Sequence, residues 1–211
     1  FGETAGAALS SHPDVDKVAF TGSTEVGKLI LQAAAGNLKK VTLELGGKSP
    51  NVVFSDADLK SAIPGAASAI FFNHGQCCCA GSRLYIEKSI FDKVVEGVCD
   101  HANKIKIGSG LDPDTQMGPL ISQEQFARVC GYLESGFSEG ATAVAGGKRR
   151  EGKGYFVEPT VLVNTNPNMK VVQEEIFGPV VTAIPFTDPD EVVRQAHNTI
   201  YGLAAGIWTK D

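Results

Sequence analysis

The sequence predicts an α/β fold, because strand-like apolar segments alternate with amphipathic helical segments along the whole chain. Turns rich in glycine separate these segments, and no internal repeat or low-complexity tract interrupts them. The chain has 211 residues, of which 43% are hydrophobic, so it can bury a core of one or two globular domains. Strands interleaved with helices are typical of layered α/β proteins.

The periodicity and the turn residues set the expected bounds of each element. The expected strands lie at residues 17–20, 41–45, 51–54, 83–86, 155–163, 180–186 and 204–209. The expected helices lie at residues 24–35, 59–72, 90–105, 123–140 and 189–198. Residues 41–45 alternate apolar and polar, which puts Thr42 and Glu44 opposite the apolar side chains, and Gly46 then ends that strand.

Capping residues support three of the five helices. Pro64 predicts a break or bend in the second helix, and Ser89 is the expected cap of the third. Ser122 and Gln125 form a capping-box pattern at the start of the fourth. Asp188, followed by proline and then acidic residues, predicts the start of the fifth.

The most informative segment is residues 75–81, with the sequence GQCCCAG, directly after the apolar residues 66–72. Glycines on both sides let the backbone bend sharply and present one sulfur to a cavity, and the symmetric position is Cys78. A zinc site normally uses separated Cys-x-x-Cys pairs, and no second cysteine or histidine cluster exists in the sequence. Adjacent cysteines strain a mutual disulfide, and Cys99 and Cys130 bring the total to an odd 5. A reactive thiol at Cys78 is therefore the favoured interpretation, and inert cysteines are the alternative.

Composition and charge exclude several functions. The net charge is -5, with no basic face for nucleic acid and no apolar run of the roughly 20 residues that span a bilayer. Unpaired cysteines favour a reducing compartment, so we expect a cytoplasmic protein. The chain begins at Phe1 without methionine or a signal-like segment, so we expect a fragment or processed product whose targeting information is missing.

Residues 22–28, with the sequence GSTEVGK, match the phosphate-loop pattern G-x-x-x-x-G-K. Leu29 stands where a serine or threonine would bind Mg²⁺, so the metal ligand of a nucleotide triphosphatase is absent. The turn still joins a strand to a helix, and the helix dipole and free N–H groups there favour an anion. Gly22 and Ser23 are the best candidates for that contact, and a plain helix N-terminus is the alternative.

Four motifs together closely resemble the NAD(P)-dependent aldehyde dehydrogenase superfamily. They are FTGSTEVG at 20–27, LELGGKSP at 43–50, GQCCCAG at 75–81 and EEIFGP at 174–179. The resemblance covers essentially the whole chain and implies an aldehyde dehydrogenase-like α/β fold. Residues 1–46 would be the end of a partial, doubly wound NAD(P)-binding region. Residues 47–211 would be an α/β catalytic domain that is incomplete at its C-terminal end.

The resemblance also implies a mechanism for oxidising an aldehyde to a carboxylic acid. Cys78 matches the nucleophile, whose thiolate would add to the aldehyde and end as a thioester. Glu44 matches the base that activates water to hydrolyse this thioester, and an exposed strand glutamate is its alternative. The backbone N–H of Cys78 would supply half of an oxyanion hole.

For the cofactor, the resemblance places Gly22 and Ser23 near the pyrophosphate, and Glu175 and Phe177 at the nicotinamide ribose. NAD is the expected cofactor, and the sequence does not exclude NADP.

Gln125 and Arg128 occupy positions that approach the adenosine ribose in many relatives, although by themselves they form a solvated helix face. The expected partners are a small aldehyde of medium apolar or aromatic character and, at full length, further copies of the protein. We expect no metal, nucleic acid or membrane partner. Two other hypotheses stay open: a folded fragment without activity of its own, and a thiol esterase that uses Cys78 and Glu44 without a cofactor.

Overall fold

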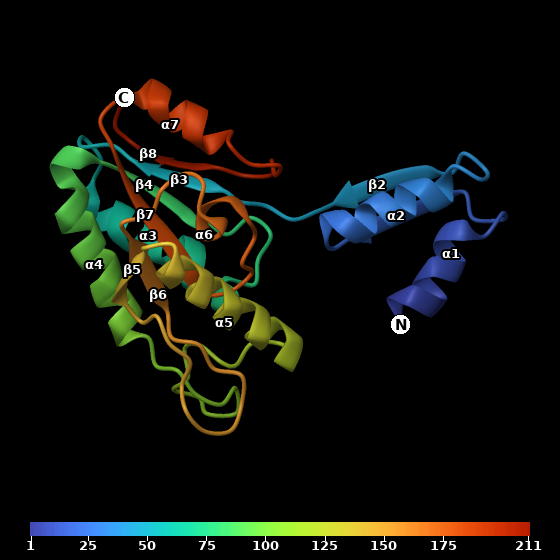
Figure 1. Cartoon of the computed structure of the whole chain (residues 1–211), viewed down its shortest axis with the longest axis horizontal. Helices are drawn as coiled ribbons and strands as arrows, with labels where there is room; N and C mark the ends of the chain where they lie inside the picture. Colours follow the sequence, from blue (N-terminus) through green and yellow to red (C-terminus); the bar gives the residue numbers. More distant parts are fainter. The chain divides into compact units, whose positions relative to one another are not determined.

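The computed structural model describes all residues from 1 to 211 and divides into two compact units, residues 1–46 and 47–211 (Figure 1). The smaller unit opens with a π-helix, Gly2–Gly6, which continues into α1, Ala7–Ser11. Strands β1, Lys17–Thr21, and β2, Lys40–Glu44, then pair in parallel, and α2, Thr24–Ala34, connects them. This unit is therefore one βαβ crossover, preceded by a helical segment that the sequence pattern did not predict.

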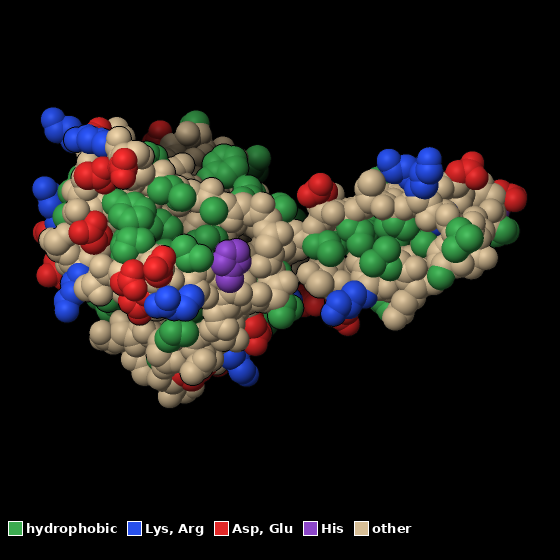
Figure 2. Space-filling model, turned by 90° about the horizontal axis from the view of Figure 1, so that it is seen from above, with side chains coloured by type: hydrophobic (Ala, Val, Ile, Leu, Met, Phe, Trp, Pro, Cys, Tyr) green, Lys and Arg blue, Asp and Glu red, His purple; other side chains and the backbone are tan.

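The smaller unit exposes much of its apolar surface, and Figure 2 shows hydrophobic side chains gathered along one of its faces. Its exposed large apolar residues are Phe1, Leu9, Val26, Leu29, Leu31 and Leu38. Only Val18, Ile30 and Ala34 are buried hydrophobic residues in this unit.

The larger unit is built on a six-stranded sheet with the order β5-β6-β7-β4-β3-β8. Its strands are β3 (Pro50–Val53), β4 (Arg83–Glu87), β5 (Thr142–Ala145), β6 (Thr160–Val163), β7 (Val180–Phe186) and β8 (Gly206–Trp208). All neighbouring strands are parallel except β5 and β6, which are antiparallel. The mixed α/β class that the sequence predicts is thus confirmed.

Helices cover both faces of this sheet (Figure 1). They are α3 (Leu59–Phe71), α4 (Phe91–Lys104), α5 (Gln123–Ser138), α6 (Lys170–Gln173) and α7 (Pro189–Ala196), with short 3₁₀ turns at Phe72–Gly75 and Lys88–Ile90. Successive strand residues enter opposite cores: Val53, Leu84 and Ile86 pack with α3 and α4, whereas Val52 and Tyr85 pack with α5, α6 and α7. Strands buried on both faces explain the nearly continuous apolar runs in the sequence. None of the helices combines the length and apolar character that crossing a membrane requires.

Most expected elements are confirmed to within two residues at each end, and two expectations are wrong. Helix α3 runs from Leu59 to Phe71 with Pro64 inside it, so of the break or bend expected there the break does not occur. Ser89 does not cap α4; it lies in the 3₁₀ turn before it, and Ile90 holds the cap position without a side-chain hydrogen bond. The strand expected from residue 155 begins only at Thr160, because the chain before it forms a single bridge from Val157 to Arg149.

Candidate active site

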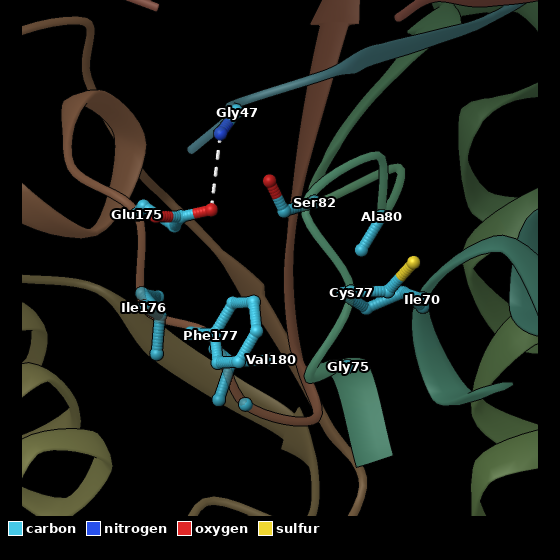
Figure 3. A pocket seen from close by; sticks show the side chains of 11 residues that line it. Gly47, Ile70, Gly75, Cys77, Ala80, Ser82, Glu175, Ile176, Phe177 and Val180 are labelled. Carbon is cyan, nitrogen blue, oxygen red and sulfur yellow. Dashed lines mark hydrogen bonds between the residues drawn. The ribbon is translucent and has the colours of Figure 1, made fainter. Parts of the chain in front are cut away.

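Three loops meet at one edge of the large sheet because each directly precedes one of three neighbouring strands. Residues 47–49 lead into β3, residues 75–82 lead into β4, and residues 174–179 lead into β7. These strands are adjacent and parallel in the order β7-β4-β3, so the segments before them converge at the amino-terminal ends of the strands. Residues from all three loops line one small cavity of about 10 Å³ (Figure 3).

The cysteine turn is approached through three consecutive residues in the left-handed region. Asn73 has φ 49, His74 has φ 62 and Gly75 has φ 67. A side chain at Gly75 would collide with the carbonyl of Gly178, so this position requires glycine for both conformation and space. Backbone held in such conformations is common where a loop must present a functional group.

The three cysteines point to different surroundings. Cys77 lines the cavity of Figure 3, and its Sγ lies 3.4 Å from Sγ of Cys79. Cys79 is exposed and lines a separate hollow of about 270 Å³. Cys78, the expected nucleophile, is half-buried and lines neither, and its backbone N–H has no acceptor within the protein. The hydrogen bond with Cys77 raises the pKa of the Cys79 thiol, and partial burial adds to this effect.

Gly47 joins the cysteine turn to the loop that carries Glu175. A Cβ atom on Gly47 would overlap the carbonyl oxygen of Cys78, so the two backbones are in direct contact. The N–H of Gly47 donates to Oε1 of Glu175 at 3.0 Å (Figure 3). No other hydrogen bond reaches the Glu175 carboxylate, which leaves its second oxygen open.

Helix α5 holds the Glu175–Phe177 segment from the other side. Nε2 of Gln125 donates to the carbonyls of Ile176 at 3.0 Å and Phe177 at 2.7 Å. Nη2 of Arg128 donates to the carbonyl of Glu175 at 3.1 Å. These bonds fix a turn in which Phe177 adopts φ 56.

The alternative interpretation of Gln125 as part of a solvated helix face is therefore wrong. Gln125 is half-buried and its side-chain amide is fully used as a donor, whereas Arg128 is exposed. The capping box forms only in part: Ser122 Oγ accepts from the Gln125 backbone N–H at 3.1 Å, but the Gln125 side chain donates away from the cap.

Two buried cations at this edge were missed in the sequence. Lys48 is only 3% exposed, and its Nζ donates to the carbonyl of Val171 at 2.9 Å. Burial lowers the pKa of Lys48 from 10.5 to about 7; the charge of Arg83 adds to this decrease, and the charges of Glu175 and Glu174 oppose it. No composition or periodicity signal marks this lysine, because lysine is normally a surface residue.

Arg83 binds the backbone of Lys48 and the end of α7. Its Nε and Nη2 donate to the Lys48 carbonyl at 2.8 and 2.5 Å. Its Nη1 and Nη2 also donate to the carbonyls of Gln195 and Ala196, at 3.0 and 2.8 Å, at the end of α7. Burial lowers the pKa of this guanidinium, and the nearby Tyr85 opposes the decrease. A fixed, planar donor set of this kind locks three carbonyls in place.

In the small unit, the candidates lie around the start of α2 and the end of β2. Ser23 caps α2, because its Oγ accepts from the Val26 N–H at 3.2 Å. Gly22 donates its N–H to the Glu44 carbonyl at 3.0 Å, so the turn after β1 is joined to the end of β2. The Glu44 side chain itself is exposed. Nowhere in the protein do three or more His, Cys, Asp or Glu side chains gather as a metal site would need.

Comparison with known proteins identifies the family. The model of the aldehyde dehydrogenase family matches residues 1–211. The chain belongs to the aldehyde dehydrogenase family. An aldehyde dehydrogenase of Emericella nidulans is 56% identical over 212 aligned residues, and the rabbit (Oryctolagus cuniculus) aldehyde dehydrogenase 1A1 is 52% identical.

Solved structures of the same family superpose closely on this chain. The NAD⁺ complex of aldehyde dehydrogenase from Bacillus cereus shares 52% identity at a TM-score of 0.98. Betaine aldehyde dehydrogenase from Staphylococcus aureus, also in complex with NAD⁺, shares 44% identity at a TM-score of 0.95. Each alignment covers 100% of this chain, which spans 43% of the length of these relatives.

Proposed function

We propose that a polypeptide of the relatives' length containing these residues, called the full-length enzyme below, oxidises an aldehyde to a carboxylic acid with NAD. This chain would supply the thiol nucleophile Cys78, the base Glu44 and part of the cofactor site. The contact that carries the proposal is made by Gly47, which packs on the carbonyl of Cys78 and binds the carboxylate of Glu175. The backbone of the candidate nucleophile and the side chain of a candidate ribose ligand are thereby both in contact with one glycine.

The residues present fit a nicotinamide dinucleotide. Glu175 has one carboxylate oxygen without a donor, which suits a ribose hydroxyl, and Phe177 lies on the same turn. Gly22 and Ser23 open the helix α2, whose N-terminal dipole favours a pyrophosphate. When bound, the cofactor accepts a hydride from the substrate carbon. Gln125 and Arg128 would support Glu175 and Phe177 through their backbone carbonyls.

The chain's own residues would carry the remaining chemistry. The Cys78 thiolate adds to the aldehyde carbon, and the backbone N–H of Cys78 donates to the oxygen that becomes negative. When this carbon loses its hydride, the oxygen re-forms a carbonyl and a thioester remains on Cys78. Glu44 then takes a proton from water, the hydroxyl adds to the thioester, and the acid leaves as the thiol is regenerated.

Substitution of Cys78 by serine tests this assignment in the full-length enzyme. Cys78→Ser should abolish both NADH formation and ester hydrolysis, whereas Cys77→Ser, the matched control, should retain both. Glu44→Gln should slow turnover but keep the pre-steady-state burst of NADH, because hydride transfer precedes hydrolysis. Equal loss of the burst in Cys78→Ser and Glu44→Gln would remove Glu44 from the role of base.

The 211-residue chain alone should not turn over aldehyde. The sheet of the small unit has two strands, whereas a dinucleotide needs the crevice between both halves of a doubly wound sheet. Calorimetric titration with NAD should show no tight binding. Steady NADH formation by the isolated chain would contradict this expectation, and ester hydrolysis without NADH formation would favour the thiol esterase.

A further inference from the structure

We propose that Lys48 is a positioning residue that holds the Glu175 carboxylate against the Gly47 N–H, in the orientation that leaves one carboxylate oxygen free. Adjacent residues make the two contacts concerned. Gly47 binds the Glu175 side chain, and Lys48 Nζ binds the carbonyl of Val171 in α6. The short helix α6 ends at Gln173, so the contact at Val171 anchors the segment that leads directly to Glu175.

Filling space and donating one hydrogen bond do not by themselves account for a buried charge at Lys48. Lys48 is buried, and a buried ammonium is costly unless an opposite charge offsets it. An ammonium group has three donors, and only one hydrogen bond, to Val171, is formed. The anions that act on Lys48 are Glu174 and Glu175, whereas Arg83 repels it. An apolar side chain would fill the same space at lower cost, so we assign the ammonium to the two neighbouring carboxylates that offset it, with its hydrogen bond to Val171 fixing the segment before Glu175.

The functional consequence concerns the cofactor. With Oε1 held by Gly47, the second oxygen of Glu175, which has no donor within the protein, is the one oriented to accept a ribose hydroxyl. This ribose contact rests on the proposed function, but the positioning of Glu175 by Lys48 does not. The decisive measurement therefore needs neither cofactor nor activity.

The sequence contains a matched pair for a spectroscopic test. The tripeptide Gly-Gly-Lys occurs at 46–48 and again at 146–148, and no other glycine follows a glycine. The 211-residue chain can be made with glycine that carries ¹³C at the carbonyl and ¹⁵N at the amide. An amide then correlates with a labelled carbonyl only where glycine follows glycine, so only Gly47 and Gly147 give a signal. Gly147 donates to the neutral Thr160 hydroxyl at 2.9 Å, and Lys148 is exposed. Gly147 thus reports the effect of a neighbouring substitution alone.

The amide proton of Gly47 should lie downfield, because its hydrogen bond to a carboxylate is charge-assisted. Lys48→Met should move this proton upfield by more than Lys148→Met moves that of Gly147. Glu175→Gln should also move it upfield. In the Glu175→Gln background, Lys48→Met should add only the change seen in the matched control. The proposal would be overturned if Lys48→Met shifted the Gly47 amide proton no more than Lys148→Met shifts that of Gly147. It would also be overturned if the shift caused by Lys48→Met were the same with Glu175 and with Gln at position 175.

A second measurement needs no substitution of the buried lysine. In the wild-type chain the Gly47 amide should titrate with a midpoint near the Lys48 pKa of about 7, while the Gly147 amide stays flat. Glu175→Gln should abolish this titration. Arg83, the other buried cation that acts on Lys48, stays charged over this pH range and so does not contribute to it. A flat Gly47 amide in the wild-type chain would contradict the proposal even if Lys48→Met does not fold.

In the full-length enzyme the same variant should separate cofactor binding from thiol chemistry. Lys48→Met should raise the KM for NAD roughly tenfold, the effect of weakening one hydrogen bond to a charged group, with the alkylation rate of Cys78 unchanged. An unchanged KM would contradict the link between Lys48 and the ribose contact. If the wild-type enzyme forms no NADH at all, the proposed function fails, and the amide shifts still decide the role of Lys48.

Discussion

Burial separates the cysteines of this chain by their expected reactivity. Desolvation raises the pKa of Cys99 and Cys130, and the hydrogen bond with Cys77 raises that of Cys79. A raised pKa lowers the thiolate fraction, and the thiolate is the nucleophile. The Cys78 thiol makes no such hydrogen bond, and the backbone N–H of Cys78 has no acceptor within the protein.

Brief alkylation at neutral pH should therefore label Cys78 before Cys99 and Cys130, because desolvation lowers the thiolate fraction of those two cysteines. Peptide mapping by mass spectrometry after short exposure to iodoacetamide gives the order. Labelling of Cys99 or Cys130 before Cys78 would count against the assignment.

Lys48 should leave a signature in the pH dependence of stability. Its pKa is about 7 in the folded chain, whereas an ordinary solvated lysine has 10.5, so between these values the unfolded chain binds a proton that the folded chain lacks. Stability should therefore rise with pH across this window, by at most about 1.4 kcal/mol per pH unit. Below about pH 7 both states are protonated and the contribution is flat.

Urea unfolding at pH 7 and pH 9, compared between the wild type and Lys48→Met, isolates this contribution, because raised tyrosine and cysteine pKa values act in both chains. The rise should be smaller in Lys48→Met. Identical pH slopes would show that Lys48 titrates alike in both states.

At the scale of the elements, two helices that look alike in sequence begin differently. Asp188 caps α7, since its Oδ1 accepts from the Asp190 N–H at 3.0 Å, whereas Ser89 makes no such bond at α4. Asp188→Ala should cost about 1 kcal/mol of unfolding free energy, and Ser89→Ala should stay within about 0.5 kcal/mol. Equal losses in thermal or urea unfolding would show that the capping assignment is wrong.

Local pattern predicted the elements wherever one signal dominated. The apolar run of β7, bounded by Pro179 and Asp188, gave its bounds correctly. The local pattern did not predict β5, because this short strand of mixed burial is formed by antiparallel pairing with β6. The strand expected from residue 155 starts late because Pro159, just before Thr160, cannot donate to the sheet.

At the scale of the whole molecule, motifs predicted the family, which comparison confirms, but not how the site is held together. The roles of Cys78, Glu44 and the cofactor residues stay predictions. Glycine and cysteine patterns are visible in sequence, whereas the Lys48 contact to Val171 joins residues 123 positions apart. The Gly47 contact to Glu175 spans 128 positions. Such long-range contacts follow from the order of β7, β4 and β3, which no single segment encodes.

The most direct test of the central claim is to trap the acyl group in the full-length enzyme. Glu44→Gln, mixed with aldehyde and NAD and quenched in acid, should carry one acyl group per chain by intact mass. Peptide mapping should place that group on Cys78. An acyl group on Cys77, Cys79 or another residue, or NADH formation with no acyl-enzyme in Glu44→Gln, would contradict the account.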